Sequence, residues 1–268
     1  MDLKSKDNPA PGKIDARHAR VPAGQRIYAV GDIHGRLDLL RPLADAIEAD
    51  DRARGPAQTT IILLGDLIDR GSDSAGVLDF ILAWRERRPL RVLIGNHEEV
   101  FLDSFTQTDA LRGLMPHGAR ETLLSYGIDV PDTDSATLRR VQDEMAARIP
   151  QRHRAFMAAL EESVLIGDYL FVHAGIEPGV PLAAQDPRAL RWIREPFLSH
   201  AGLYPYVVVH GHTIRPEAEE RPNRIGIDTG GYCYGLLTAL VLEGGERRFI
   251  QAEERDGGIV VRQRAATD

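Results

Sequence analysis

Short apolar runs alternate along most of this chain with segments of helical periodicity. Residues 26–30, 59–64 and 90–94 are β-rich runs with little polar alternation, which is typical of strands buried on both faces of a sheet. Between them, apolar residues recur at three- and four-residue spacing over 37–47 and 77–84, which predicts helices. This order predicts parallel strands joined by helical crossovers, and therefore an α/β fold.

The second half of the chain predicts a helical insertion and a second sheet. Apolar stripes over about 100–163 indicate helices that cover the first sheet, and Pro150 separates two of them. Several β-rich runs follow, and Gly244-Gly245 is a candidate hairpin turn. We therefore expect a second, antiparallel or mixed sheet packed on the first. The runs are 169–172, 206–209, 224–228, 236–242 and 247–252.

One domain over residues 25–255 accounts for these elements, since 268 residues are ample for a single α/β core. Residues 1–24 mix charges with prolines and glycines and show no periodicity, which predicts a flexible N-terminal tail. We expect a second tail at the other end, over residues 256–268.

The amino-acid composition restricts which partners the protein can bind and in which cellular compartment it is expected. A formal net charge of −7 and an isoelectric point near 5.7 argue against a protein that binds nucleic-acid backbones, which needs a basic face. The single cysteine, Cys233, excludes an intrachain disulfide framework and favours a reducing compartment. The apolar runs are too short to span a bilayer, and the N-terminal residues lack the apolar core of a secretory signal. We expect a soluble cytoplasmic protein without nucleic-acid or membrane partners.

Polar side chains that can bind metals follow five of the predicted strands. The carboxyl ends of parallel strands lie at one edge of a sheet, so we expect Asp32, Asp66 and Asn96 to converge. Three oxygen-type and three nitrogen-type ligands suit two divalent ions that share a bridging carboxylate. A zinc ribbon is excluded by the cysteine count. The candidate ligands are Asp32, His34, Asp66, Asn96, His173 and His212.

Five short motifs at these strand ends occur in a fixed order. They are Gly31-Asp32-Ile33-His34-Gly35, Gly65-Asp66-Leu67-Ile68-Asp69-Arg70-Gly71, Gly95-Asn96-His97-Glu98, His173-Ala174-Gly175 and Gly211-His212-Thr213. Together they resemble the calcineurin-like metallophosphoesterases, and within them the bacterial form of the phosphoprotein phosphatase family. The resemblance covers about residues 26–242 and implies a four-layer α/β/β/α sandwich of two mixed β-sheets, with a dimetal site at the strand C-terminal edge.

The resemblance implies a cofactor of two divalent metal ions, Mn²⁺ in the first place, with Fe or Zn as alternatives. Asp32 and His34 would bind the first ion, and Asp66 would bridge both. The second ion would be completed by Asn96, His173 and His212, and Asn96 would also contact the substrate phosphate. A hydroxide that bridges the two ions would attack phosphorus directly, without a phosphoenzyme.

The resemblance also implies the residues that handle the substrate. His97 would donate a proton to the leaving alkoxide, and Asp69 would keep that imidazole charged. Arg70 would bind the phosphate as a bidentate fork, and Arg194 would be the second phosphate-binding arginine, with Arg191 as the fallback.

Other polar residues near the motifs receive no chemistry. We expect Glu98 to have a local structural role, and His210 to be a packed histidine or to support a ligand from behind. Four histidines outside the motifs are expected to have no catalytic role. They are His18, His117, His153 and His200.

Three functions remain open at this point. The first is a phosphatase that hydrolyses phosphate monoesters, with phosphoserine or phosphothreonine in proteins or a small phosphorylated molecule as substrate. The second is symmetrical hydrolysis of diadenosine tetraphosphate, which the motifs do not distinguish from the first. The insertion, which is expected to form a wall of the cleft, carries seven arginines that could bind the additional phosphates. The third, a non-catalytic binding scaffold, is disfavoured because every expected site residue is present. The arginines are Arg112, Arg120, Arg139, Arg140, Arg148, Arg152 and Arg154.

Overall fold

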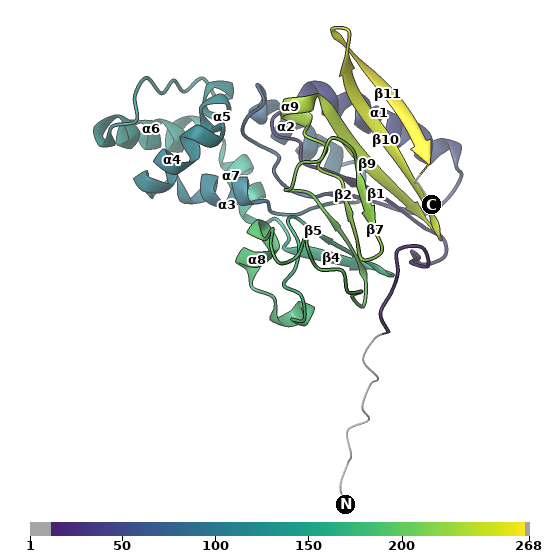
Figure 1. The fold of residues 1–268 in the computed structure, drawn as a ribbon. Coiled ribbons are helices and arrows are strands. Elements are labelled where there is room, and N and C mark those ends of the chain that lie inside the picture. The colour runs from purple at the N-terminus through teal and green to yellow at the C-terminus, as the bar shows by residue number, and fades with distance from the viewer. Residues whose placement is uncertain (1–11, 266–268) are drawn as a thin grey trace, which may run out of the picture.

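A computed structural model describes residues 12–265 and contains two β-sheets that pack face to face, with helices on their outer faces (Figure 1). In the first sheet, three parallel strands form one side, and three antiparallel strands from the C-terminal part of the chain extend the other. The register aligns Val30 with Leu63, so the first two strands end at the same level. In sheet order the strands are β11 (Gly258–Ala265), β10 (Glu246–Arg255), β9 (Leu236–Glu243), β1 (Gln25–Val30), β2 (Gln58–Leu63) and β3 (Leu90–Val92).

The second sheet is mixed, as predicted, and it contains the runs at 169–172, 206–209 and 224–228. The prediction is wrong for the runs at 236–242 and 247–252, because β9 pairs with β1 and β10 with β9, so both strands extend the first sheet. Its three central strands run parallel to one another, and an antiparallel strand borders them on each side. In sheet order the strands are β4 (Ser163–Ile166), β5 (Tyr169–Val172), β6 (Val207–His210), β8 (Arg224–Gly226) and β7 (Glu219–Arg221).

Side chains that alternate along β1 divide between two hydrophobic cores. Ile27 and Ala29 lie in the core between the sheets, whereas Tyr28 and Val30 lie in the core beneath the helices of the first sheet. A third core packs the outer face of the second sheet against helix α8 and the loop that follows it, where Phe197 is fully buried. The result is the four-layer α/β/β/α sandwich expected from the motifs.

The helices follow the sequence patterns closely. Asp73 caps α2 and Asp134 caps α6 through side-chain hydrogen bonds to backbone N–H groups, and Pro150 separates α6 from α7. Helices α4–α6 lie together at the side of the sheets (Figure 1). No helix of the described residues is long and apolar enough to cross a lipid bilayer. The helices are α1 (Leu37–Ala53), α2 (Ser74–Arg85), α3 (Asn96–Asp103), α4 (Thr108–Leu114), α5 (Ala119–Ser125), α6 (Ser135–Arg148), α7 (Gln151–Ala158), α8 (Pro187–Trp192) and α9 (Gly231–Tyr234), with 3₁₀ turns at Met115–His117 and Leu182–Ala184.

The structure corrects both expected tails. The tail predicted over 256–268 is wrong for 258–265, which pair with β10 as strand β11. Asp256 and Gly257 both have positive φ, and an Asp-Gly pair of this kind is a strong hairpin signal. The tail predicted over 1–24 is wrong for its second half, since Val21 is buried and its N–H donates to the Gly244 carbonyl at 3.0 Å. Residues 1–11 and 266–268 lie outside the described residues.

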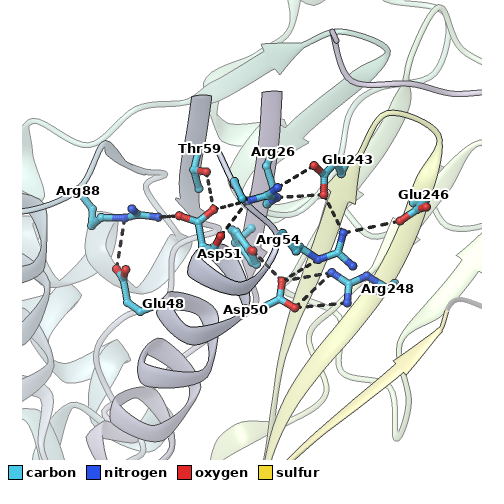
Figure 2. Close-up of polar contacts among 12 residues, drawn as sticks. Arg26, Glu48, Asp50, Asp51, Arg54, Thr59, Arg88, Glu243, Glu246 and Arg248 are labelled. Carbon is cyan, nitrogen blue, oxygen red and sulfur yellow. Dashed lines mark hydrogen bonds and ion pairs between the residues drawn. The ribbon is translucent and has the colours of Figure 1, made fainter. Parts of the chain in front are cut away.

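A network of ion pairs ties the first sheet together at the end where β1 and β2 begin (Figure 2). At its centre is Arg26, whose side chain is only 1% exposed. Its guanidinium donates to both carboxylate oxygens of Glu243, at 3.0 and 2.8 Å, and to Asp51 Oδ1 at 2.7 Å. Asp51 also accepts from Thr59 and Arg88. The network therefore links β1, β2, β9 and the C-terminal end of α1 through ion pairs and hydrogen bonds. The remaining members are Glu48, Asp50, Arg54, Glu246 and Arg248.

The network predicts a pH-dependent stability. The hydrogen bond from Arg26 lowers the pKa of Glu243 to about 2, from an ordinary value of 4.5. Its stabilisation is therefore full above about pH 4.5 and is lost as the pH falls from there towards 2. At pH 7 we expect Glu243→Gln to lower the free energy of unfolding by roughly 1.5 kcal/mol, the lower limit for charged hydrogen bonds, since 33% of this side chain is exposed.

The measurement is thermal unfolding of wild type and Glu243→Gln between pH 7 and pH 3. The difference in melting temperature between them should shrink as the pH falls. The matched control is Glu246→Gln in the same hairpin, whose carboxylate is 72% exposed and should matter by less than about 0.5 kcal/mol. A difference that stays constant down to pH 3 would contradict the prediction.

Candidate active site

The carboxyl ends of strands from both sheets meet at one buried cluster. Asp66, which follows β2, lies at its centre and belongs to two groups of possible metal ligands. Its carboxylate lies within 4.8 Å of ligand atoms of His34 and His97 in one group, and of His173 and His212 in the other. All five side chains are buried. The convergence expected from the parallel strands is therefore present, and Asp66 has the central place that a bridging ligand requires.

The two remaining candidate ligands lie at the edges of this cluster. Asn96, the first residue of α3, places Oδ1 at 3.0 Å from Nε2 of His173. Both carboxylate oxygens of Asp32 accept from the backbone N–H of His212, at 3.2 and 3.0 Å. None of the sequence motifs includes Asp228, which is buried beside Asp32. Burial raises the pKa of Asp32, and the carboxylates of Asp228 and Asp66 raise it further, because three carboxyl groups lie close together at this end of the cluster.

Three imidazoles of the cluster present Nε2 as their ligand atom, although Nε2 of His173 also lies near Asn96 Oδ1. His34 Nδ1 lies 2.9 Å from the Ile68 carbonyl and His173 Nδ1 lies 2.8 Å from that of Leu64, and since a carbonyl only accepts, each Nδ1 carries the proton. Their Nε2 lone pairs then face Asp66. Nε2 of His212 is buried without a hydrogen-bond partner among the described residues. Burial lowers the pKa of His34 to about 3 and that of His212 to about 2, so these rings are neutral, as metal ligands must be.

Glu98 holds the loop that carries Asp66, which agrees with the structural role expected for it. Its carboxylate accepts the backbone N–H groups of Gly95, Asp66 and Leu67 at 2.7–2.9 Å, and the side chain is fully buried. Asp66 has a φ of 48°, in the left-handed region that non-glycine residues rarely adopt. The hydrogen bonds of Glu98 offset this strain and fix the position of the central carboxylate.

His97 lies between two residues of the second motif. Its Nδ1 is 2.7 Å from Asp69 Oδ2, and its Nε2 is 3.2 Å from a guanidinium nitrogen of Arg70. Burial alone would lower the pKa of His97, but the charge of Asp66 and the hydrogen bond to Asp69 outweigh it and raise the pKa. The Arg70 guanidinium also lies 4.4 Å from the ring centroid of Tyr232, a contact that no sequence signal indicated.

A pocket of about 410 Å³ opens over the cluster. Arg194 lines it together with Arg70, as expected, whereas the fallback residue Arg191 pairs with Glu162 and Glu99. Trp192 forms part of the same wall. The insertion supplies the opposite wall, which confirms its expected place beside the cleft. Its lining residues are Val100, Ala110, Gly113, Leu114 and His117.

Two histidines outside the ligand set differ in position. His117, to which the sequence analysis assigned no role, lines the pocket. His210 is buried, its Nδ1 lies 3.1 Å from the Gly211 carbonyl, and its ring packs edge-on against Phe197. It belongs to neither group of metal-ligand side chains, in agreement with a packed histidine.

Comparison with known proteins gives a consistent assignment. A family model described as calcineurin-like phosphoesterase matches residues 25–226. The chain is 33% identical over 153 residues to the symmetrical bis(5'-nucleosyl)-tetraphosphatase of Paracidovorax citrulli, covering 57% of this chain and 45% of that protein. It is 32% identical over 107 residues to serine/threonine-protein phosphatase 1 of Salmonella typhimurium, covering 40% of this chain and 43% of that protein. The matched segments thus span less than half of these relatives.

A solved structure supports the fold. The crystal structure of a cold-active protein tyrosine phosphatase superimposes with a TM-score of 0.53, covering 97% of this chain and 87% of that one. The two sequences are 17% identical, so this likeness concerns the architecture alone.

The role of Glu98 predicts a specific loss of stability. Glu98→Gln keeps the shape of the side chain but replaces one acceptor oxygen by a donor, which leaves at least one buried backbone N–H unpaired. We expect the free energy of unfolding to fall by about 1–3 kcal/mol, measured by urea denaturation with an unchanged slope. The neighbouring substitution Glu99→Gln is the control. It leaves no backbone N–H unpaired and an amide oxygen can still accept from Trp192 Nε1, while the partly exposed ion pair with Arg191 that it removes should matter by less than about 1 kcal/mol. Equal losses in the two variants would count against the assigned role of Glu98.

Proposed function

The chain belongs to the calcineurin-like phosphoesterase family, and from this premise we propose that it hydrolyses phosphate monoesters in the manner of a phosphoprotein phosphatase. The observation that carries the proposal is one pocket that combines the His97–Asp69 pair, two arginines, and a cluster of neutral imidazoles and carboxylates. A phosphorylated protein or a small phosphate ester is the proposed substrate. We propose the cytoplasm as the compartment, since one cysteine in 268 residues fits a reducing environment.

The donor set of the cluster fits divalent metal ions. The unpartnered Nε2 of His212 and the adjacent buried carboxylates of Asp32 and Asp228 are the observations that support this. When bound, two such ions would activate water and stabilise the charge that develops on the phosphoryl group. We propose Mn²⁺ first, with Fe and Zn as alternatives, because imidazole and carboxylate ligands suit all three. The proposed ligands are Asp32, His34, Asp66, Asn96, His173 and His212.

The protein's own residues would bind the phosphate and deliver a proton. Arg70 and Arg194 would bind phosphoryl oxygens, since guanidinium groups present paired donors to them. Asp69 holds Nδ1 of His97, so Nε2 faces the pocket beside Arg70. The Arg70 guanidinium can only donate, so Nε2 accepts from it in this structure. A bound phosphate would take over that guanidinium, and Nε2, once protonated, would lie within reach of the ester oxygen and pass its proton to the leaving alkoxide.

The cationic groups of the pocket favour a monoester over diadenosine tetraphosphate. Among the described residues, Arg70 and Arg194 are the only arginines that line the pocket, and none of the insertion's seven arginines does so. Four of the seven form hydrogen bonds elsewhere: Arg112 with Asp109, Arg120 with the Val130 carbonyl, Arg148 with the Gly127 carbonyl, and Arg152 with Asp79. Two arginines match one phosphate group better than a chain of four.

We predict that the wild-type protein with Mn²⁺ hydrolyses p-nitrophenyl phosphate and phosphoserine peptides at least tenfold faster than diadenosine tetraphosphate. A chelator should abolish the activity, and added Mn²⁺ should restore it. The control variant His97→Ala should lose about 10²–10³-fold in kcat on the phosphopeptides, within the usual range for general acid catalysis. A preference for the dinucleotide would make the protein a nucleotide hydrolase, and inactivity with every metal would support the scaffold instead.

Substitution of Arg194 and of Arg191 should affect kcat/KM to different extents. We expect Arg194→Met to lower kcat/KM on phosphate monoesters by about 10–100-fold, the equivalent of one charged hydrogen bond lost. Arg191→Met, the matched variant three residues earlier, should lower it by less than about threefold, since Arg191 pairs with Glu162 and Glu99 outside the pocket. The opposite order would assign the phosphate contact to Arg191.

A further inference from the structure

Thr122, in helix α5 of the insertion, completes the hydrogen bonding of Asp69. Its Oγ1 donates to Asp69 Oδ1 at 2.6 Å and accepts the backbone N–H of the same residue at 2.8 Å. Both side chains are fully buried. Among residues 12–265, the donors to the Asp69 carboxylate are Thr122 on one oxygen and His97 on the other. The insertion therefore contacts directly the carboxylate that orients the proposed proton donor.

The hydroxyl groups around Asp69 fit one arrangement of protons. A threonine hydroxyl has one proton, and Thr122 uses it on the carboxylate, which can only accept when ionised. The 2.8 Å contact between Thr122 Oγ1 and Ser74 Oγ must then be donated by Ser74. Ser74 Oγ in turn accepts from the Asp69 N–H at 3.1 Å. Ser74 thus donates to Thr122 and Thr122 donates to Asp69, whose carboxylate also accepts from the His97 imidazole through its other oxygen.

The insertion also holds the strained backbone of this motif. Asp69 and Arg70 have φ values of 70° and 72°, so two consecutive non-glycine residues are left-handed. Thr122 accepts the first N–H, and the carbonyl of Gly118 accepts that of Arg70 at 3.1 Å. Gly118 has a φ of 100°, and a Cβ on it would lie 2.3 Å from the Arg70 nitrogen. This close contact fixes the insertion against the motif.

We propose that Thr122 is a positioning residue for the proton transfer by His97, which rests on the function proposed above. By holding Oδ1, Thr122 sets the direction of the Asp69 carboxylate, so that Oδ2 keeps the His97 ring with Nε2 towards the leaving oxygen. Without this contact, the carboxylate and the ring can rotate away from the productive geometry.

The proposal makes the loss depend on the leaving group. An alkoxide such as that of serine or glycerol needs a proton as the bond to phosphorus breaks, whereas p-nitrophenolate leaves as a stable anion. A defect in proton delivery therefore slows alkyl phosphates much more than p-nitrophenyl phosphate. A general loss of folding or of metal would slow both equally.

The experiment compares wild type, Thr122→Val and Thr122→Ser on β-glycerophosphate, a phosphoserine peptide and p-nitrophenyl phosphate. We expect Thr122→Val to lower kcat on both alkyl phosphates about tenfold or more, part of the 10²–10⁴ that general acids contribute, with little change in KM. On p-nitrophenyl phosphate the loss should stay below about threefold. Thr122→Ser keeps the hydroxyl and should recover most of the activity. If Thr122→Val does not fold, Thr122→Ala serves in its place, with the same expectation.

The matched control is Ser125→Ala in the same helix. Ser125 Oγ accepts the N–H of Ala75 at 3.1 Å and donates to the Thr122 carbonyl at 2.6 Å, so it ties α5 to α2 without contacting Asp69. Any change in kcat of this variant relative to wild type should be the same for alkyl phosphates and for p-nitrophenyl phosphate. Metal content is measured for each protein. Equal losses on all substrates, losses that follow metal content, or no rescue by serine would overturn the proposal. A wild type inactive on every substrate would instead overturn the proposed function.

Discussion

The rest of the structure depends on a concentration of buried negative charge at one edge of the two sheets. Asp32, Asp66 and Asp228 are all buried there, and burial lowers the pKa of the His34, His173 and His212 imidazoles, whereas the pKa of His97 is raised by the nearby carboxylates. Carboxylates in such a place are costly unless a cation accompanies them. Parallel strands bring them together, and loops with left-handed residues aim them inwards, so the fold gathers at this edge a set of groups that could hold metal ions.

Buried carboxylates are stabilised in different ways at the two ends of the first sheet. At the end where β1 and β2 begin, Arg26 and its neighbours neutralise Glu243 and Asp51 within the protein (Figure 2). At the other end, backbone N–H groups hold the buried carboxylates, most clearly that of Glu98. The first arrangement stabilises the fold by itself. The second arrangement places polar groups where they could bind a ligand. Its loops depend on hydrogen bonds to offset the strain of their left-handed residues.

Local signals in the sequence were sufficient for the strands, for the motifs at their ends and for the convergence of Asp32, Asp66 and Asn96, because parallel strands end at one edge. They were insufficient where a partner comes from a distant segment. Thr122 has no motif of its own, and it is placed by the packing of α5 against α2. Spacing alone could not choose between Arg194 and Arg191, since only their surroundings differ. Strand β11 was missed although its Asp-Gly turn is a local signal.

The insertion is more than a cover for the cleft. One short stretch, from α4 to α5, lines the pocket with Leu114 and His117, holds the backbone of Arg70 through Gly118, and bonds the carboxylate of Asp69 through Thr122. Substrate contacts and support of the proton donor are therefore parts of the same rigid element. A change in the insertion that reshapes the pocket would also shift the second motif, because Gly118 leaves no space between them. Under the proposed function, the shape of the pocket and the delivery of the proton would therefore be linked through this one stretch of the insertion.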